Sequence, residues 1–243
     1  MEPNISIMMV TYNRLELTKQ TLTKLWDTAG VDNFNLVIVD NGSSDDTVEW
    51  LKSLDRDNIH FIFNKENKGI GIGRNQALYY AHNILKSKYF ATMDNDVICP
   101  QNFLKDSIEI LDNTNFAMIG VNFEGKQYPI IDANGYKIQY KAQGNLGTAF
   151  ICFSKAFKLL GYFDTSYGKY GLEDSNYGMR AQRIGLKLGY VIENGIHLGE
   201  EPPEDPYRQY KTKTHDAYLD KFNQDCRDYY SGKKSVYISW KPE

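Results

Sequence analysis

Short apolar runs alternate with amphipathic segments through the first part of the chain, and this alternation limits the fold more than any other feature. Runs with the length of buried strands occur at residues 5–10, 34–40, 59–63 and 89–93. Apolar residues near helical spacing occur between them, at residues 15–29, 43–54 and 71–85. Strands and helices that alternate in this way form right-handed crossovers on a parallel sheet. The sequence therefore predicts an α/β fold, with a mostly parallel central sheet and helices on both faces.

The second half of the chain is less regular. A further helix is predicted at residues 103–111 and a further buried strand at residues 116–121. Asn134-Gly135 lies between two β-rich runs, which is the pattern of a two-residue hairpin turn. A helix from about residue 174 to residue 184 follows. These features indicate a smaller, hairpin-containing region in the same domain.

Composition and charge exclude several classes of protein. Of the 243 residues, 42% are hydrophobic and 24% charged, which is enough apolar material for a core. The formal net charge of −3 argues against a general affinity for nucleic acid or anionic membrane. Three distant cysteines indicate free thiols in a reducing compartment. No signal peptide or membrane span is recognised, so a cytoplasmic protein is expected.

Polar side chains follow three of the predicted strands, at the point where each strand ends. They are Thr11, Tyr12, Asn13 and Arg14 after the first strand, Asp40 and Asn41 after the second, and Asp94, Asn95 and Asp96 after the fourth. Because the carboxyl ends of parallel strands meet at one edge of a sheet, these side chains can converge on one ligand. For Asp40 a plain turn is the competing interpretation, since the residues that follow it are good turn formers.

Asp94 and Asp96 are spaced to share one face of an extended chain. Two carboxylates are hard oxygen ligands that suit Mg²⁺ or Mn²⁺, and these ions complete their shells with water and substrate phosphates. A pair of this kind would hold a cation that neutralises a diphosphate. The competing interpretation is an Asx turn at the end of a strand.

A glycine-rich segment at residues 67–75 opens the third helix. Its glycines, including Gly69, do not follow the dinucleotide spacing G-x-G-x-x-G. Backbone N–H groups at the start of a helix can face an anion, and Arg74 can pair with a phosphate or contact a base. A loop with one Arg on the helix surface is the alternative.

Two further candidates lie in the second half. Glu173 and Asp174 stand at the expected start of a helix, where one carboxylate can act as a general base for an attacking hydroxyl. The alternative is stabilisation of the helix N-terminus by negative charge. His197 can ligate a transition metal, although a lone histidine is more often a packed or surface residue.

These motifs together resemble the family 2 glycosyltransferases of the GT-A fold. The matching pieces, in chain order, are MMVTYNR, LVIVDNGSSDDT, NKGIGIGRNQAL, ATMDND and GLEDSNYGMR, and they cover roughly the first 190 residues. The resemblance implies a GT-A domain at residues 1–199, with a Rossmann-like nucleotide-binding half at 1–98 and an acceptor-binding half at 99–199. Residues 200–243 would form a C-terminal extension that packs on this domain.

The resemblance also implies a reaction. A nucleotide-diphosphate sugar, usually a UDP-sugar, would donate its sugar with inversion at the anomeric carbon, assisted by Mn²⁺ or Mg²⁺. Asp174 would be the catalytic base, and Glu173 would orient the acceptor hydroxyl. Asp96 would bind the cation, with Asp94 on the ribose or the metal-linked waters and His197 as a further metal ligand. The expected donor-binding set is Thr11, Tyr12, Asn13, Arg14, Asp40, Asn41, Gly69, Arg74, Asp94 and Asn95.

The acceptor stays open at this stage. A polysaccharide, a lipid-linked glycan, a protein or a modified nucleic acid would each fit, and residues 144–150 and 167–174 are expected to line its site. Because the Q-x-x-R-W motif of processive synthases is absent, one sugar is expected to be added per encounter. The aromatic C-terminal segment is expected to be a packed helix, with a lid or an acceptor platform as the alternatives.

Three other functions compete with this hypothesis. A sugar-1-phosphate nucleotidyltransferase would carry a glycine-rich loop after its first strand, where this chain has TYNRLELT. A non-catalytic nucleotide-sugar-binding module would not need the acidic residues. An NAD-dependent oxidoreductase would place its glycines after the first strand, not after the third.

Overall fold

The structure is a computed structural model that describes residues 4–142, 150–199, 204 and 206–242. Its strands are β1 Ile5–Thr11, β2 Asn35–Asp40, β3 Ile59–Phe63, β4 Tyr89–Met93, β5 Val97–Ile98, β6 Phe116–Asn122, β7 Ile130–Ala133, β8 Tyr136–Lys141, β9 Phe150–Phe153, β10 Lys187–Asn194 and β11 Ile196–His197. Its helices are α1 Leu15–Thr28, α2 Thr47–Lys52, α3 Ile70–Asn83, α4 Phe103–Asn113, α5 Lys155–Leu160, α6 Glu173–Arg183 and α7 Pro206–Tyr230, with a 3₁₀ turn η1 at Thr165–Tyr167.

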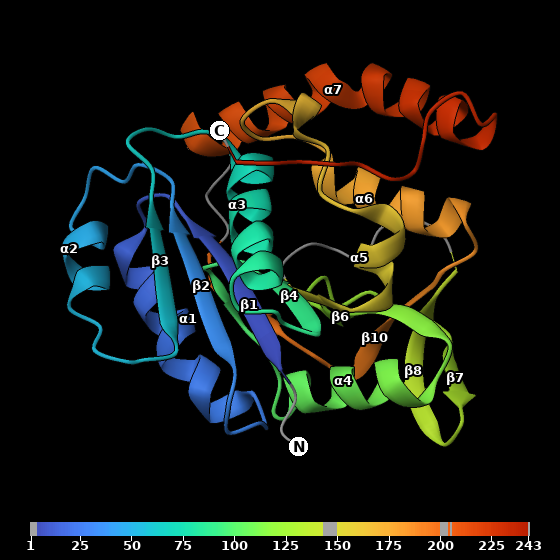
Figure 1. Cartoon of the computed structure of the whole chain (residues 1–243), viewed down its shortest axis with the longest axis horizontal. Coiled ribbons are helices and arrows are strands. Elements are labelled where there is room, and N and C mark those ends of the chain that lie inside the picture. The colour runs from blue at the N-terminus through green and yellow to red at the C-terminus, as the bar shows by residue number, and fades with distance from the viewer. Residues whose placement is uncertain (1–3, 143–149, 200–203, 205, 243) are drawn as a thin grey trace.

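Within these residues, nine strands form one central sheet in the order β3-β2-β1-β4-β9-β6-β10-β8-β7 (Figure 1). Strands β3, β2, β1 and β4 pair in parallel, and β10 pairs in parallel with β6. Strand β9 is antiparallel to both β4 and β6, and β8 is antiparallel to β10 and β7. All strands of this sheet except β8 and β9 therefore run in one direction. The predicted fold class, an α/β fold with a mostly parallel central sheet, is confirmed.

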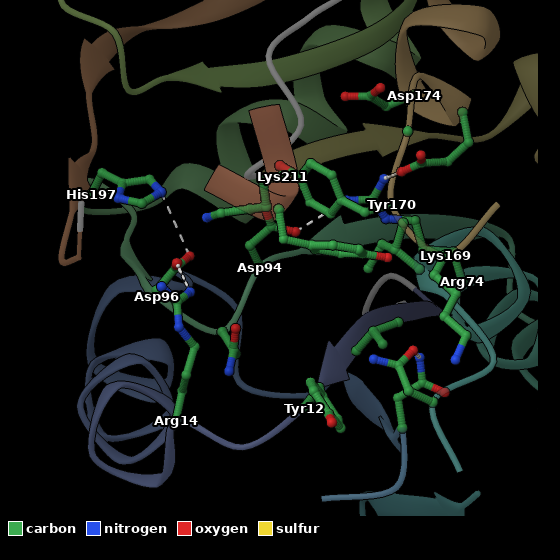
Figure 2. Close-up of a pocket in the computed structure, with 18 residues that line it drawn as sticks. Tyr12, Arg14, Arg74, Asp94, Asp96, Lys169, Tyr170, Asp174, His197 and Lys211 are labelled. Carbon is green, nitrogen blue, oxygen red and sulfur yellow. Dashed lines mark hydrogen bonds and ion pairs between the residues drawn. The ribbon is translucent and has the colours of Figure 1, made fainter. Parts of the chain in front are cut away.

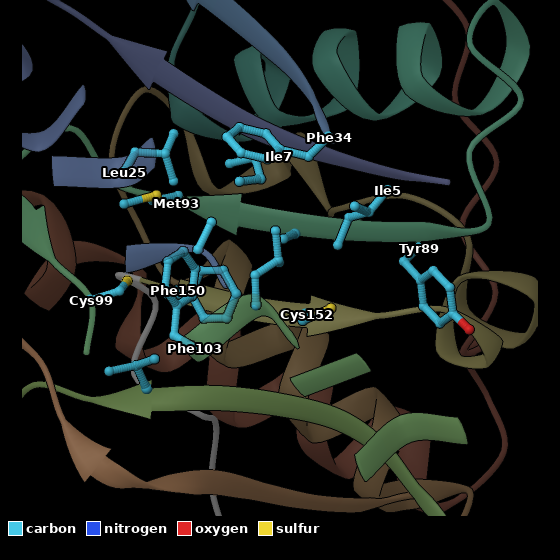
Figure 3. Packing of buried hydrophobic residues seen from close by; sticks show 14 of the residues in the cluster. Ile5, Ile7, Leu25, Phe34, Tyr89, Met93, Cys99, Phe103, Phe150 and Cys152 are labelled. Atoms are coloured by element: carbon cyan, nitrogen blue, oxygen red, sulfur yellow. The ribbon is translucent and has the colours of Figure 1, made fainter. Parts of the chain in front are cut away.

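Helices cover both faces of the sheet because each central strand is apolar on both sides. In β1, Ile5, Ile7 and Met9 face a core shared with α1, α2 and α4, whereas Met8 faces the core under α3, α5 and α6. This alternation is the period-two geometry of a strand. In the first core, the rings of Phe103 and Phe150 meet edge to face at 4.8 Å (Figure 3).

The predicted hairpin connects β7 to β8 at one edge of the sheet. Asn134 and Gly135 both have positive φ, 55° and 87°. Two consecutive residues of this kind form the turn whose twist matches that of paired strands, and Asn-Gly is the pair that adopts it best. The smaller hairpin-containing region is therefore present, beside β10.

A second, two-stranded sheet forms just after β4. Strand β11 pairs antiparallel with β5, with His197 opposite Val97. The backbone N–H of Leu198 donates to the carbonyl of Asp96 at 2.7 Å. This short pairing brings His197 to the end of β4, although the two segments are about a hundred residues apart in the chain.

The C-terminal segment begins with the long helix α7, which lies beside α6 at one end of the molecule (Figure 1). The segment after α7 is held at Val236, whose carbonyl accepts from the fully buried guanidinium of Arg180; the same guanidinium donates to the carbonyls of Leu160 and Tyr162. The expected packed helix is thus observed. The proposed division of the chain at residues 98 and 199 stays a prediction. Among the described residues, none of the helices combines the length and apolar character that crossing a membrane would require.

Candidate active site

One pocket collects most of the predicted site residues, at the carboxyl ends of β1 and β4 (Figure 2). Residues from widely separated parts of the chain line it: Val10, Tyr12, Arg14, Asn41, Asn67, Ile70, Arg74, Asp94, Asn95, Asp96, Lys169, Tyr170, Gly171, Glu173, Asp174, His197, Tyr210 and Lys211. The wall is predominantly polar and carries both acids and bases. Side chains that follow β1, β2 and β4 therefore meet in this pocket, although Asp40 itself is not among the lining residues.

A left-handed turn follows β1 and aims Arg14 into the pocket. Asn13 and Arg14 have φ angles of 57° and 64°. Asn tolerates this conformation because its short side chain bonds locally. The Asn13 backbone N–H donates to Ser43 Oγ at 2.7 Å, and its Oδ1 accepts from the Ser44 N–H at 2.8 Å. Asn13 thus fastens the turn to the loop after β2, while Tyr12, 38% exposed, stands at the pocket.

Thr11 supports the site from behind instead of lining it. It is buried, and its hydroxyl accepts from the Asn95 amide at 3.1 Å. The same amide donates to Thr18 Oγ1 at 2.8 Å. These bonds lock Asn95, between the two candidate cation-binding acids, against α1.

Asp40 is buried and does form the expected turn, because its Oδ2 accepts from the N–H groups of Gly42 and Ser43 at 3.1 and 3.0 Å. Its other oxygen, Oδ1, is buried without a hydrogen-bond partner among the described residues. A buried acceptor left unpaired costs about 1–3 kcal/mol. The turn interpretation therefore accounts for only one of the two oxygens.

The neighbouring Asn41 organises the glycine-rich segment. Its amide donates to Asn67 Oδ1 and to the Gly69 carbonyl, and its Oδ1 accepts from the Lys68 N–H. Gly69 has a φ of 94°, and a Cβ there would lie 2.7 Å from the Cα of Lys169. Only glycine fits this close approach of two loops, so Gly69 shapes the start of α3 without lining the pocket.

Arg74 forms an ion cluster in the pocket wall with the buried Glu173 and the partly exposed Asp94. Its guanidinium donates to Glu173 Oε1 at 2.7 Å and to Asp94 Oδ1 at 3.1 Å. Burial raises the pKa of Glu173, and the nearby Asp174 raises it further. Burial also raises the pKa of Asp94, against the opposing effect of Arg74. The cluster joins the end of β4 to the start of α6.

Asp96 lies between the guanidinium of Arg14 and the imidazole of His197, as Figure 2 shows. Its Oδ2 accepts from Arg14 Nη1 at 2.7 Å, and its Oδ1 is 3.7 Å from His197 Nε2. Asp94 instead contacts Arg74. In the part of the chain that the structure describes, no group of three or more His, Cys, Asp or Glu side chains is arranged to hold a metal ion. Asp96 and His197 are therefore a two-donor pair.

Asp174 occupies the first turn of α6 and lines the pocket, with its Oδ1 accepting from the Ser175 N–H at 2.6 Å. Acidic side chains are favoured in the first turn of a helix, where unpaired backbone N–H groups point outward. In Figure 2 it stands across the pocket from Asp96 and His197. Asp174 is thus placed to act on a group that enters from the side opposite the acidic strand end.

Some lining residues were not among the predicted donor, metal or catalytic set. Lys169 and Tyr170 come from the expected acceptor loop at 167–174, whereas Tyr210 and Lys211 come from α7. Lys211 Nζ lies 5.9 Å from the centre of the Tyr170 ring. Burial lowers the pKa of Lys211, and Arg14 lowers it further. The aromatic-basic composition of the C-terminal segment hinted at these residues; residues 144–149 lie outside the described residues.

Comparison with known proteins identifies the class. The family model described as "Glycosyl transferase family 2" matches residues 6–161, and the chain belongs to this family. It is an enzyme domain of the glycosyltransferase type, as predicted. The matched region ends before Glu173 and Asp174, so both acids lie outside it.

Curated relatives carry the same assignment. The chain is 29% identical over 115 residues to "Uncharacterized glycosyltransferase MJ1057" of Methanocaldococcus jannaschii, which covers 46% of this chain and 38% of the relative. It is 41% identical over 81 residues to "Bifunctional glycosyltransferase pgtA" of Dictyostelium discoideum, covering 32% and 10%. The chain therefore spans less than half of the length of these relatives.

Solved structures share the fold. A mannosyltransferase, PcManGT of Pyrobaculum calidifontis, in complex with GDP-Man and Mn²⁺, superposes with a TM-score of 0.61 at 16% identity, covering 86% of this chain and 60% of that one. Residues 1-349 of TarS of S. aureus, in complex with UDP-GlcNAc, superpose with a TM-score of 0.63 at 17% identity, covering 94% and 73%. Both are GT-A glycosyltransferases, so the predicted GT-A fold is confirmed.

Proposed function

We propose that this chain transfers one sugar from a nucleotide-diphosphate sugar, with a UDP-sugar as the expected donor, to an acceptor hydroxyl with inversion of configuration. One observation carries the proposal: a single pocket presents Asp96 from the end of β4 and Asp174 from the start of α6 on opposite sides. A direct displacement needs this separation, because the leaving group and the attacking oxygen stand on opposite faces of the sugar.

The nucleoside would bind beside the ends of β1 and β2. The unpaired Oδ1 of Asp40 is an acceptor that the N–H of a nucleobase would satisfy. Tyr12 offers an exposed ring at the pocket for stacking. Arg74 would lie beside the ribose and the first phosphate, since Asp94 and Glu173 hold its guanidinium in the wall.

The residues at the end of β4 fit a divalent cation that arrives with the diphosphate. Asp96 and His197 supply one oxygen and one nitrogen, a donor set that suits Mn²⁺ and that substrate phosphates and water would complete. Asp94 stands two residues away for the ribose or the metal-linked waters. When bound, such a cation would supply positive charge against the leaving diphosphate. Lys169 and Lys211, which also line the pocket, add cationic charge from the protein itself.

The attack on the sugar depends on Asp174. Its carboxylate would take the proton from the acceptor hydroxyl as the oxygen approaches the anomeric carbon, which typically contributes a factor of about 10²–10⁴ in rate. Glu173 would help to orient that hydroxyl, and its bond to Arg74 fixes the start of α6 at the same time. The attacking oxygen, the anomeric carbon and the leaving oxygen then lie in line.

Several acceptors and a cytoplasmic location are consistent with this proposal. The loop at 167–174 and α7 both contribute to the pocket lining, and a polysaccharide, a lipid-linked glycan, a protein or a modified nucleic acid would each be a candidate acceptor there. Three free cysteines, with Cys99 and Cys152 buried, fit a reducing compartment. The two solved structures support either UDP or GDP as the nucleotide.

A hydrolysis screen tests the proposal. UDP-, GDP- and dTDP-sugars are incubated with the protein, with and without Mn²⁺, and the released nucleoside diphosphate is measured. We expect one UDP-sugar to be hydrolysed fastest, and only with the metal present. Absence of turnover with every nucleotide sugar would favour a non-catalytic binding module. Release of pyrophosphate from a nucleoside triphosphate and a sugar phosphate would favour a nucleotidyltransferase.

A further inference from the structure

The loop that presents Asp174 is held between two helices. It leaves η1 at Tyr167, passes Lys169 and Tyr170 in the pocket wall, and enters α6 at Glu173. On one side, the Ile70 N–H of α3 donates to the Lys169 carbonyl at 2.9 Å. On the other side the loop meets α7, which lies outside the region matched by the family.

The contact with α7 is tight and places a buried tyrosine at its centre. A Cβ on Gly168 would lie 2.5 Å from the hydroxyl of Tyr218. Next to it, Tyr167 is 1% exposed, and its hydroxyl donates to Asp225 Oδ2 at 2.6 Å. The same hydroxyl accepts from the amide of Asn176 on α6 at 3.1 Å. Tyr167 therefore joins the loop, α6 and α7 through one oxygen.

Asp225 is itself fixed by two lysines. Lys221 Nζ donates to its Oδ2 at 2.7 Å, and Lys234 Nζ donates to its Oδ1 at 3.0 Å. Lys234 also reaches Asp164 Oδ2 at 3.2 Å, at the residue that precedes η1. The network thus holds the chain at Asp164 and at Tyr167, just before the loop begins.

Charge-assisted bonds are shorter and stronger than neutral ones, and the acceptor Asp225 is buried although both lysines are partly exposed, so this network can fix a loop that has no regular structure of its own. The segment from Gly168 to Leu172 lies between these fixed points and the proposed catalytic acids. A displacement of Tyr167 would therefore be transmitted along this short segment to Asp174. A misplacement of about 1 Å, even one caused far from the chemistry, can cost up to ~100-fold in rate.

We propose that Asp225 on α7 is a positioning residue, which acts through Tyr167 to hold the loop that presents Asp174 to the acceptor. The inference rests on the proposed function for its catalytic consequence, but its structural consequence can be measured without any substrate. On this inference, the C-terminal segment contributes to catalysis because it fixes the position of Asp174.

The chain offers a matched pair of variants for the test. Tyr167→Phe removes one hydroxyl from the network and keeps the ring. Tyr229→Phe removes a hydroxyl from another buried tyrosine on α7, and that hydroxyl has no hydrogen-bond partner among the described residues. Asp225→Asn and Asp225→Ala extend the series, because Asn keeps the shape and one acceptor whereas Ala removes both.

Amide hydrogen exchange gives the readout that is independent of activity. We expect Tyr167→Phe and Asp225→Ala to speed exchange in peptides that cover residues 165–174, with β1 to β4 unchanged. Tyr229→Phe should match the wild type. Unchanged exchange at 165–174 in both network variants would overturn the proposal. So would a uniform rise across the chain, which would show that the network only contributes global stability.

Turnover gives the second readout, with the nucleotide sugar that the screen identifies. We expect Tyr167→Phe and Asp225→Ala to lower kcat by up to ~100-fold, with the KM for the nucleotide sugar unchanged, and Asp225→Asn to recover part of the loss. If Tyr167→Phe and Tyr229→Phe give the same kcat, the catalytic link is wrong. If the wild type turns over no nucleotide sugar, the proposed function fails while the exchange result still stands by itself.

Discussion

The two sides of the pocket are built in different ways. On the donor side, Tyr12, Arg14 and Asp96 follow directly from the ends of β1 and β4, so the sheet itself places them. On the acceptor side, Asp174 and Lys211 depend on a loop and on a helix that dock through long-range polar contacts. The comparison teaches that a parallel sheet fixes the side chains at its strand ends, whereas the carboxylate of Asp174, the proposed base, is placed by tertiary contacts.

The largest expected effect tests the acceptor side. Asp174→Asn keeps the side-chain shape but removes the base, so we expect transfer to fall by about 10²–10⁴-fold. Binding of the nucleoside diphosphate, measured by calorimetry, should stay near the wild-type value because the donor side is intact. Transfer at the wild-type rate would show that another group acts as the base.

The next effect concerns Arg74, whose ion pairs with Asp94 and Glu173 join the two sides of the pocket. Arg74→Ala would leave Glu173 buried without its cation, and breaking a buried pair costs about 3–5 kcal/mol. Urea unfolding would measure the loss of folding free energy. Lys19→Ala is the control: it removes one partner of the exposed Lys19–Glu16 pair, which contributes about 1 kcal/mol or less. Equal losses in both variants would mean that these ion pairs contribute little.

A third prediction tests the donor side alone. Asp96→Ala should weaken Mn²⁺-dependent binding of the nucleoside diphosphate by about tenfold or more, as loss of a metal ligand or its support commonly does. Calorimetry with and without Mn²⁺ checks this. If Asp96→Ala retains some turnover, adding Asp174→Asn to this variant should lower its kcat further. Identical affinities for variant and wild type with the metal present would remove Asp96 from the cation site.

The smallest expected effect is a pH dependence of the folding stability, caused by the titration of Asp225 in its network with Tyr167 and the two lysines. Burial raises the pKa of Asp225, but the bonds from Lys221, Tyr167 and Lys234 outweigh it, and the net pKa is lowered. A carboxyl group with a depressed folded pKa stabilises the fold above its unfolded pKa of about 3.9 and loses that stabilisation as the pH falls through the folded value.

We therefore expect the wild-type Tm to drop below about pH 4 more steeply than that of Asp225→Asn, which cannot titrate at this position. Thermal unfolding between about pH 3 and pH 7 measures both curves. Asp164, whose pKa is also lowered despite burial because Ser166 and Lys234 donate to it, keeps part of the acid sensitivity in the variant. Parallel curves for the two proteins would contradict the assignment.

The same contrast explains what the sequence could predict. The alternation of apolar runs with helical segments is a local pattern, and it predicted β1 to β4 and the helices between them. Asp94 and Asp96 were found because they follow a buried strand. The meeting of Asp96 and Asp174 in one pocket required only the rule that parallel strands end at one edge and the resemblance to a family.

The contacts that dock α7 onto the domain could not be predicted, for a physical reason. Its docking depends on Tyr167 and Asp225, which are buried, and on the half-buried Lys234, and these polar contacts form only when distant segments meet. Likewise, the pairing of Glu173 with Arg74 joins residues 99 positions apart. The position of Lys211 in the pocket follows from these contacts and from no local motif.

Paramagnetic broadening by Mn²⁺ tests the central claim most directly. The protein is titrated with Mn²⁺ together with the nucleoside diphosphate that the screen identifies, and backbone amide signals are followed. The account predicts broadening around residues 94–98 and 196–198 and, across the pocket, around residues 173–175, with none in the β7–β8 hairpin. Broadening confined to another surface, or at the end of β4 without any effect at the start of α6, would contradict a single active centre.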